Sequence, residues 1–245
     1  MFSPHFRNRI HRKLLEFGWL VMRVNPAPGG WLSGRTYFDP RYISRLGFRP
    51  RTLVDVGVGQ GTPPLYDAFP EPYLVLIEPL AEFDSHINAI LARRDGELVR
   101  TALGHRDETC VMLVEPHYTE RSSIFARAPI DQTGDSPQPR DIPVTTLDSL
   151  QSKHHWNPPF GLKIDTEGCE LDVVRGAREF LRETLFVIVE VNVLNRFPGS
   201  YRFAEFIAAM DEVGFELCDI LDIARTSATD VNFVDLIFRN SHLES

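Results

Sequence analysis

The sequence predicts an α/β fold with a single doubly wound, mostly parallel sheet. Apolar runs typical of buried strands alternate along the chain with segments of helical spacing. A glycine-rich loop follows the first of these runs, and acidic residues follow several others. Near the C-terminus, two apolar runs are joined by a polar loop with no helix between them, which predicts a closing antiparallel hairpin.

The first strand and its loop are the most informative stretch. Residues 52–56 are apolar around Asp55, glycines follow at 57, 59 and 61, and Thr-Pro-Pro then offers a helix start. Glycine has no Cβ, so the backbone here can approach a ligand closely. The spacing matches neither the dinucleotide pattern G-x-G-x-x-G nor a phosphate loop with its lysine. An acid at this loop would repel a pyrophosphate and favours a cationic, hydroxylated ligand such as S-adenosylmethionine.

The second predicted strand ends in another acid. Residues 73–77 form a continuous apolar run, as expected for a strand buried on both faces, and Glu78-Pro79 follow. Glu78 lies 21 positions after Gly57. At about this spacing, the acid of a nucleotide-binding βαβ unit accepts hydrogen bonds from ribose hydroxyls. We therefore expect Glu78 to contact a nucleoside.

The middle of the chain is regular up to residue 114 and irregular after it. Helical spacing over 83–94 precedes a predicted strand and loop over 97–104 and a further predicted strand over 109–114. Residues 115–141 contain four prolines and a polar run. Long irregular segments in compact domains are often functional, so we expect this one to set substrate specificity. Its candidate polar contacts are His117, Tyr118, Ser122 and Ser123.

Two later strands bring acids to the same edge of the sheet. The stretch 142–150 is predicted to be a short strand that enters a helix. The strand over 160–165 ends in Asp165, with Glu167 in the turn before a helix over about 171–181. The strand over 186–192 carries Glu190 and Asn192 near its end. Open α/β sheets bind ligands at the carboxyl ends of their strands. A helix over 203–213 and the hairpin strands 215–221 and 231–238 complete the domain.

Composition narrows the function. The net charge of −8 argues against a general nucleic-acid binder, which needs a basic face. The three cysteines form no C-x-x-C pair, and no His/Cys cluster has metal-ligand spacing, so we expect no metal and no disulfide framework. A reducing, cytoplasmic compartment fits this cysteine usage best.

The N-terminal residues predict a separate helical extension. Residues 1–24 are basic and then apolar, but a glutamate interrupts the run, which is too short to span a membrane. We expect an amphipathic helix that could pack on the domain, cover a substrate or touch an anionic membrane surface. The expected division is an N-terminal helix and cap over 1–48 and the main domain over 49–245. The oligomeric state is left open.

Several motifs together resemble the FkbM family of S-adenosylmethionine-dependent methyltransferases. The strongest is Lys-Ile-Asp-Thr-Glu-Gly-Cys-Glu at 163–170, because a glycine loop alone is weak evidence. The other matching stretches, in the family's order between about 50 and 192, are 54–61, 77–79, 102–104, 122–124, 144–148 and 189–191.

The resemblance implies a seven-stranded class I methyltransferase fold, S-adenosylmethionine as the donor, and O-methylation of a hydroxyl, often on a sugar, glycan or secondary metabolite. Carried over by position, Asp55 and the loop would hold the methionine part, Glu78 and Pro79 the ribose, and Ala102-Leu103 the adenine. Asp165 would lie near the transferring methyl group. The loop residues implied are Gly57, Val58, Gly59, Gln60 and Gly61.

Removal of the acceptor's proton needs a base, and the candidates are Asp165, Glu167 and Glu190, with His117 as a further one. The alternative for Glu167 and Glu190 is a structural role, in which they bind backbone amides at the helix start or orient the loop. Gly59 stands where the family commonly has asparagine, and Pro63-Pro64 open the next helix unusually. Two other functions stay open: a non-catalytic binding module with this fold, and an NAD(P)-dependent oxidoreductase, although the loop lacks its glycine pattern.

Overall fold

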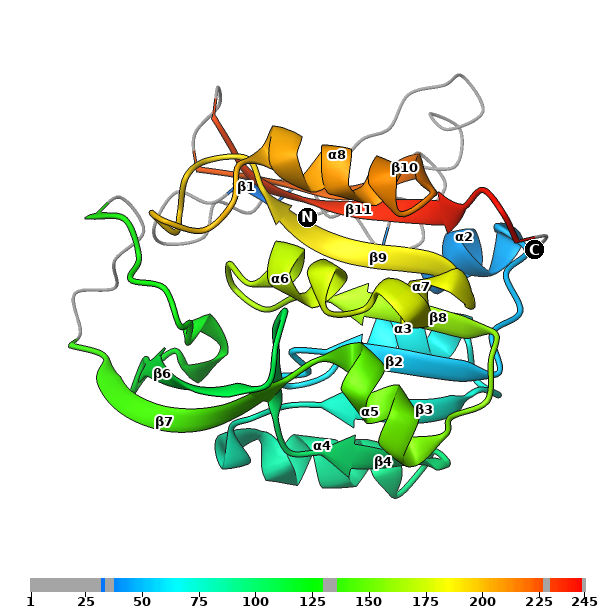
Figure 1. Cartoon of the computed structure of the whole chain (residues 1–245), viewed down its shortest axis with the longest axis horizontal. Helices are drawn as coiled ribbons and strands as arrows, with labels where there is room; N and C mark the ends of the chain where they lie inside the picture. The colour runs from blue at the N-terminus through cyan, green and yellow to red at the C-terminus, as the bar shows by residue number, and fades with distance from the viewer. Residues whose placement is uncertain (1–31, 34–37, 130–135, 227–229, 244–245) are drawn as a thin grey trace, which may run out of the picture.

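In the computed structural model, the structure describes residues 32–33, 38–129, 136–226 and 230–243. The main sheet of this described part has eight strands (Figure 1). Their spatial order is β1 (Leu32–Ser33), β10 (Phe215–Arg225), β11 (Val231–Asn240), β9 (Thr184–Asn192), β8 (Phe160–Ile164), β2 (Thr52–Val56), β3 (Tyr73–Ile77) and β4 (Gly96–Val99).

The predicted doubly wound sheet is confirmed. The five strands from β9 to β4 run parallel, and β11 and β10 pair antiparallel as the predicted hairpin at the other side. All five residues of β2 are buried, as are those of β8, because both strands are covered on both faces. The two-residue β1 adds an eighth strand at the edge of β10.

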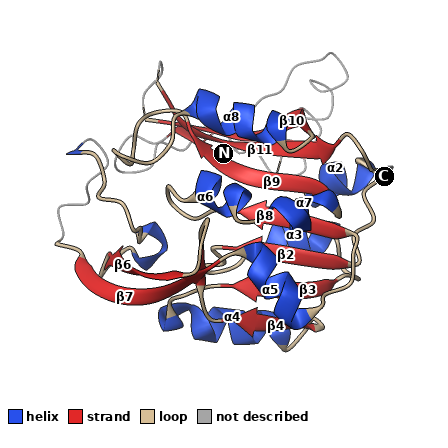
Figure 2. Cartoon of the chain, in the orientation of Figure 1, coloured by secondary structure: helices blue, strands red, loops and turns tan. Residues whose placement is uncertain are grey.

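Helices cover both faces of the sheet (Figures 1 and 2). One face packs on α2 (Pro40–Arg45), α3 (Pro63–Ala68) and α4 (Asp84–Leu91), which follows the short 3₁₀ helix η1 (Ala81–Phe83). The other face packs on α5 (Leu147–His154), α6 (Glu170–Arg175), α7 (Arg178–Arg182) and α8 (Phe203–Glu212). The buried apolar residues accordingly form two clusters, one on each side of the sheet.

A second, three-stranded sheet was not expected from the sequence. It contains β5 (Ala102–Leu103), β7 (Gln138–Thr145) and β6 (Glu108–Val114), and the 3₁₀ helix η2 (Thr119–Arg121) follows β6. The strand expected at the start of 97–104 is confirmed as β4, which stops at Val99, but the loop expected after it contains β5, which pairs with β7. The Thr101 hydroxyl, which donates to the carbonyl of Pro143 (3.1 Å), holds the chain at this change of sheet.

The sequence prediction places the start of β7 too late, because prolines are rare in strands. This strand begins at Gln138, before the predicted 142, and includes Pro139. Over this first part β7 pairs only with β6, because β5 reaches no further than Val144 and Thr145. A proline is tolerated where one side of a strand has no partner, since it has no N–H to donate.

The single helix predicted over about 171–181 is two helices in the structure. α6 ends at Arg175 and α7 begins at Arg178. A Cβ on Gly176 would lie 2.1 Å from the carbonyl oxygen of Gly104, so the chain needs glycine where it passes that loop. The close approach explains the break, which the spacing of apolar residues does not reveal.

The N-terminal prediction is largely outside the described residues. The amphipathic helix expected within 1–24 cannot be placed, and the division at residue 48 stays a prediction. Part of the expected cap is described: α2 begins after Asp39, whose side chain accepts a hydrogen bond from the Arg41 N–H. In the ranges that the structure describes, every helix is too short or too polar to cross a bilayer.

The glycine loop joins β2 to α3 and lies against the end of β8. Gly57 has φ +74°, and a Cβ there would lie 1.8 Å from the carbonyl oxygen of Asp165. Gly59 also has positive φ (+51°), yet nothing lies within 4 Å of the Cβ position. The loop is thus tightly packed at its first glycine and open at its second.

Replacing these two glycines by alanine should have unequal effects. Both variants incur the positive-φ penalty of roughly 1–2 kcal/mol, but only Gly57→Ala forces a clash with backbone. For Gly59→Ala we expect only the fall in Tm that the φ penalty causes, at roughly 2–4 °C per kcal/mol. For Gly57→Ala we expect a much larger fall in Tm, because the backbone clash is added to that penalty. Thermal unfolding followed by circular dichroism measures both. An equal loss in the two variants would contradict the close approach of β2 and β8.

Candidate functional site

A pocket opens at the carboxyl ends of β2, β3 and β8. Residues of the three-stranded sheet and of the loop after β6 form its opposite wall. The residues that line the pocket include Gly57, Gly59, Glu78, Pro79, Phe83, Ala102, Leu103, Cys110, Met112, Ser122, Ile124, Val144, Asp165 and Glu167. The pocket therefore contains part of the glycine loop and both acids of the 165–167 turn.

Asp55 lies beneath this pocket and does not line it. Its carboxylate is fully buried, and Oδ2 accepts a hydrogen bond from the Tyr66 hydroxyl (2.5 Å). Oδ1 lies 3.3 Å from Lys163 Nζ, on the neighbouring strand. Burial, and then the charge of Asp55, raise the pKa of Tyr66, so Tyr66 stays a donor. Asp55 thus supports the loop from below, through α3 and β8.

Lys163 links two carboxylates at the floor of the site. Its Nζ lies 3.3 Å from Asp55 Oδ1 and 3.2 Å from Asp165 Oδ2. Burial alone would lower the pKa of Lys163, but Asp165 and Asp55 outweigh it and hold this pKa above its usual range. The lysine is therefore a permanent cation that fixes one oxygen of Asp165. The Asp165 side chain is 36% exposed and faces the pocket.

Glu78 is buried at the end of β3 and holds the loop closed. One oxygen accepts the Gly59 N–H (3.0 Å) and the other accepts the Leu80 N–H (2.9 Å). Burial raises the pKa of Glu78, against the effect of these two N–H groups and of Arg100. Each carboxylate oxygen keeps acceptor capacity for a second donor.

The far end of the pocket is apolar. Leu103, Met112 and Val144, from the three strands of the small sheet, lie there with Ile124 and Phe83. Such a wall suits a flat aromatic ring. Three predicted loop residues lie outside this lining: Val58 is buried in the core, Gln60 is exposed, and Gly61 packs against Ile90.

The turn 165–170 is held by its own last residue. Glu170 Oε1 accepts hydrogen bonds from the N–H groups of Thr166 and Gly168, and from the Thr166 hydroxyl. Its other oxygen accepts the Tyr201 hydroxyl (2.6 Å). Burial raises the pKa of Glu170, which these donors oppose. Glu167 inside the turn has φ +54°, a conformation rare for a residue with a side chain and often found at functional sites.

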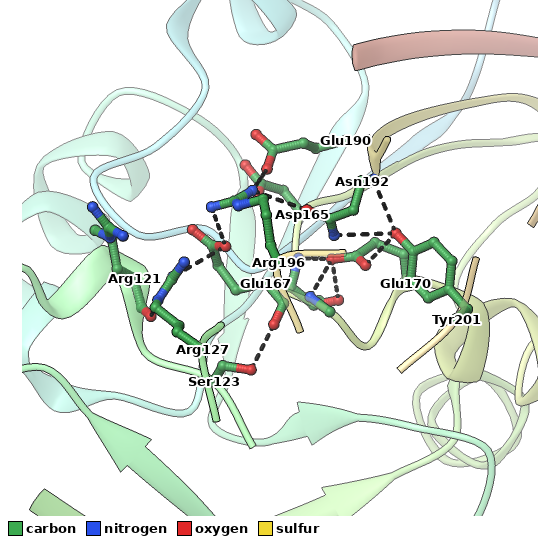
Figure 3. Close-up of polar contacts among 12 residues, drawn as sticks. Arg121, Ser123, Arg127, Asp165, Glu167, Glu170, Glu190, Asn192, Arg196 and Tyr201 are labelled. Carbon is green, nitrogen blue, oxygen red and sulfur yellow. Dashed lines mark hydrogen bonds and ion pairs between the residues drawn. The ribbon is translucent and has the colours of Figure 1, made fainter. Parts of the chain in front are cut away.

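Two buried arginines clamp the acids of this edge (Figure 3). Arg196 contacts Glu167 Oε2 through Nη2 and Glu190 Oε1 through Nη1, both at 3.0 Å. Arg127 Nη2 contacts Glu167 Oε2 at 3.1 Å. Both guanidinium groups lie over the ring of Phe197. The clamp joins three loops, those after β6, β8 and β9.

The clamp separates the three candidate bases. Glu167 and Glu190 are engaged by arginine, whereas Asp165 contacts only the lysine beneath it among the residues that the structure describes. Burial, and then the charges of Asp165 and Glu167, raise the pKa of Glu190, and Arg196 opposes this. The roles of all three residues stay predictions.

The predicted acceptor contacts do not form one group. His117 and Tyr118 are exposed and outside the pocket lining, and Ser122 lines it. The Ser123 hydroxyl donates to the Glu167 carbonyl (2.6 Å), which helps to hold the strained turn. Asn192 is buried and accepts a hydrogen bond from Arg196 (3.1 Å). Their binding roles stay predictions.

Sequence reasoning did not single out Lys163, Arg127, Arg196 or Tyr201 as functional residues. Lys163 stands inside the motif at 163–170, two positions before Asp165, and alternation along a strand puts both on one face. The arginines lie in loops, where no periodicity identifies a partner. Among the described residues, no group of three or more His, Cys, Asp or Glu side chains has an arrangement that could hold a metal ion.

The pocket fits S-adenosylmethionine. No protein atom lies within 4 Å of the Cβ position of Gly59, so a ligand can approach the loop backbone there. Glu78 presents carboxylate oxygens for ribose hydroxyls, and the apolar wall around Leu103 suits an adenine. Asp165 offers a negative charge for the cationic end of the molecule.

Comparison with solved structures finds proteins of low sequence identity, methyltransferases among them. Precorrin-6y C5,15-methyltransferase from Geobacter metallireducens is 13% identical, with 80% of this chain and 82% of that chain covered and a TM-score of 0.40. Magnesium protoporphyrin IX methyltransferase from Synechocystis, with bound S-adenosylmethionine, is 10% identical, with 82% and 76% covered and a TM-score of 0.43. Fibrillarin from Methanococcus jannaschii is 8% identical, with 84% and 70% covered and a TM-score of 0.44.

The family comparison is decisive. A search of curated proteins found no match. The methyltransferase FkbM domain, however, matches residues 55–217, which is more than half of the chain and runs from the glycine loop to the first strand of the hairpin. This range contains Glu78, the three-stranded sheet and the turn 165–170. The chain therefore belongs to the FkbM family of methyltransferases, which use S-adenosylmethionine as methyl donor.

Proposed function

We propose that this protein methylates a hydroxyl oxygen of a small acceptor, such as a sugar, a glycan or a secondary metabolite, and that Asp165 receives the hydroxyl proton. The position of Asp165 carries the proposal. Its carboxylate lines the pocket at the end of β8, one oxygen is held by Lys163, and no arginine engages it among the described residues.

The cofactor supplies an electrophilic methyl group when bound. The protein has to align the acceptor oxygen and to remove its proton. A carboxylate is a weak base toward an alcohol, so the proton has to move late, once the oxygen has begun to bond and its acidity has risen. Lys163 holds one oxygen of Asp165 in place for this step (Nζ to Oδ2, 3.2 Å).

Glu167 and Glu190 act as positioning residues in this proposal. Arg196 holds both of them, and Arg127 adds a second contact to Glu167. Removing one member would leave a buried charge without its partner, which typically costs about 3–5 kcal/mol. Their main effect is on the shape of the loops beside Asp165.

In this proposal the glycine loop binds the methionine part of the cofactor, Glu78 and Pro79 bind the ribose, and the apolar surface at Ala102-Leu103 binds the adenine. Asp55 contributes from beneath, through Lys163 and Tyr66. The acceptor enters beside Asp165, where Ser122 and the exposed Tyr118 are the proposed contacts. The protein works in the cytoplasm in this proposal, in keeping with its free thiols at Cys110, Cys169 and Cys218.

Isothermal titration with S-adenosylmethionine tests the cofactor site. Loss of a charge-assisted hydrogen-bonding group costs about 1.5–3 kcal/mol, so Glu78→Ala should weaken binding by roughly 10–100-fold. Glu82→Ala is the matched control, because Glu82 lies four residues further on, half-exposed, and bonds to Arg140 outside the pocket. We expect the control to bind like wild type.

Three outcomes of this titration would change the proposal. Equal weakening by the two variants would show that Glu78 has no specific role. No response of the wild-type protein to S-adenosylmethionine or S-adenosylhomocysteine would favour a non-catalytic module with this fold. Binding of NADH would favour an oxidoreductase.

Asp165→Asn should lower kcat for methyl transfer by roughly 10²–10⁴-fold, the usual contribution of a positioned base. Glu167→Gln should instead lower Tm, with a smaller effect on kcat, since it disturbs the arginine clamp. Radiolabelled methyl transfer to a panel of hydroxylated acceptors measures kcat. Glu179→Gln, exposed on α7, is the control. Full turnover of Asp165→Asn would remove this residue from the chemistry.

A further inference from the structure

A row of carboxylates crosses the sheet from the pocket to its antiparallel edge. Asp222 on β10 pairs directly with Asp235 on β11, and Asp235 pairs directly with Glu190 on β9. The last register pair of β8 with β9 is Ile164 with Val189. The next position in this register brings Asp165 beside Glu190. Four acids from four adjacent strands therefore follow one another, and the row ends at the pocket.

Residues directly opposite on neighbouring strands share a face of the sheet, with Cβ atoms about 4.5–5.5 Å apart. Four like charges in such a row would repel one another strongly. Three members have donors: Lys163 for Asp165, Arg196 for Glu190, and the Ile223 N–H for Asp222. In the part of the chain that the structure describes, the Asp235 carboxylate has no hydrogen bond and no ion pair. The row thus favours a proton at its centre.

The charged groups that face Asp235 come from three elements. They are Glu190 on β9, Asp222 on β10, and Asp165 with Lys163 at the end of β8. Burial, followed by the charges of Asp165 and Asp222, raises the pKa of Asp235 to about 7, although Lys163 opposes this. Glu190 lies between Asp235 and Asp165, and its pKa is raised as well.

Asp165 has to pass the proton on before the next turnover, and its ion pair with Lys163 occupies one of its two oxygens. We propose that Glu190, Asp235 and Asp222 form a relay that takes the acceptor's proton from Asp165 and passes it across the sheet to solvent. The inference rests on the proposed function, because it starts from proton transfer to Asp165.

The relay conserves atoms and charge. As the acceptor oxygen bonds to the methyl carbon, the carbon–sulfur bond of the donor would break with its electron pair left on sulfur. The O–H bond of the acceptor breaks with its electron pair on the oxygen of the new ether, and the proton binds Asp165. It then moves to Glu190 and Asp235, directly or through a bridging water, and leaves at Asp222 on the half-exposed edge. One proton is released per turnover, and each carboxylate returns to its starting state. No oxidant or metal takes part. Glu190, Asp235 and Asp222 are positioning residues, because they act through Asp165.

Asp235→Asn removes the centre of the relay at nearly constant shape. At pH 8 we expect kcat to fall by about tenfold or more, within the range of proton-transfer effects, with KM for the acceptor unchanged. Wild-type kcat should also fall as the pH drops below about 7, because a protonated Asp235 cannot accept a second proton. The variant should lack this dependence. Asp235→Glu should restore most of the rate.

Glu216→Gln is the matched control. Glu216 lies on β10, is exposed and faces Arg239 across the hairpin, outside the row. It should keep the wild-type rate and pH profile. A wild-type rate and profile in Asp235→Asn would overturn the relay. A raised acceptor KM with unchanged kcat would also overturn it, and would make the row a binding surface for the acceptor.

A second measurement needs neither cofactor nor acceptor. The pKa of Asp235 is raised on folding, so between about pH 4 and 7 the folded protein holds a proton that the unfolded chain releases. Wild-type stability falls as the pH rises through this window, and that of Asp235→Asn does not. The Tm advantage of the variant should therefore grow from pH 4 to 7 and stay constant above. A constant difference at all pH values would contradict the titration. This result stands even if no methyl acceptor is found, so the two hypotheses fail separately.

Discussion

The site depends on one buried cation between two strands. Lys163 on β8 lies directly opposite Asp55 on β2, and its ammonium group also reaches Asp165 beyond the end of β8. An isolated charge at this depth would be very unfavourable, and the two carboxylates together offset the loss of water. The contact joins the strand that carries the glycine loop to the strand that carries the acidic turn. Because Gly57 also packs against the Asp165 backbone, the two loops have one relative position.

The arginine clamp serves the same purpose further from the sheet centre. Loops are the least constrained parts of an α/β domain, and three of them meet beside Asp165. Arg127 and Arg196 each contact Glu167, and their stacking on Phe197 limits where the guanidinium groups can lie. The left-handed backbone of Glu167 is tolerated because its carbonyl and its carboxylate are both held. Rigid loops of this kind place an acceptor more accurately than side chains on free loops would.

Acidic residues outnumber basic ones at this edge, which affects its chemistry. Lys163, Arg127 and Arg196 do not balance Asp55, Asp165, Glu167, Glu190 and Asp235, even before the buried Glu170 is counted. Such a site has to hold protons near neutral pH, as the raised pKa values of Glu190 and Asp235 indicate. It also suits a cationic methyl donor better than an anionic one.

The sequence by itself determined the main sheet, the hairpin, the family and the acids at the strand ends. Hydrophobic runs and loop glycines are local signals, so β2, β3, β8 and β9 could be predicted from them. The small sheet and the break at Gly176 could not, because they depend on contacts with β7 and with Gly104 far along the chain. Only the tertiary structure decided that Asp55 is a buried support, that arginines engage Glu167 and Glu190, and that Asp235 stands in line with Asp165. The register of the strands and the contacts between loops bring these residues together, and local periodicity encodes neither of them.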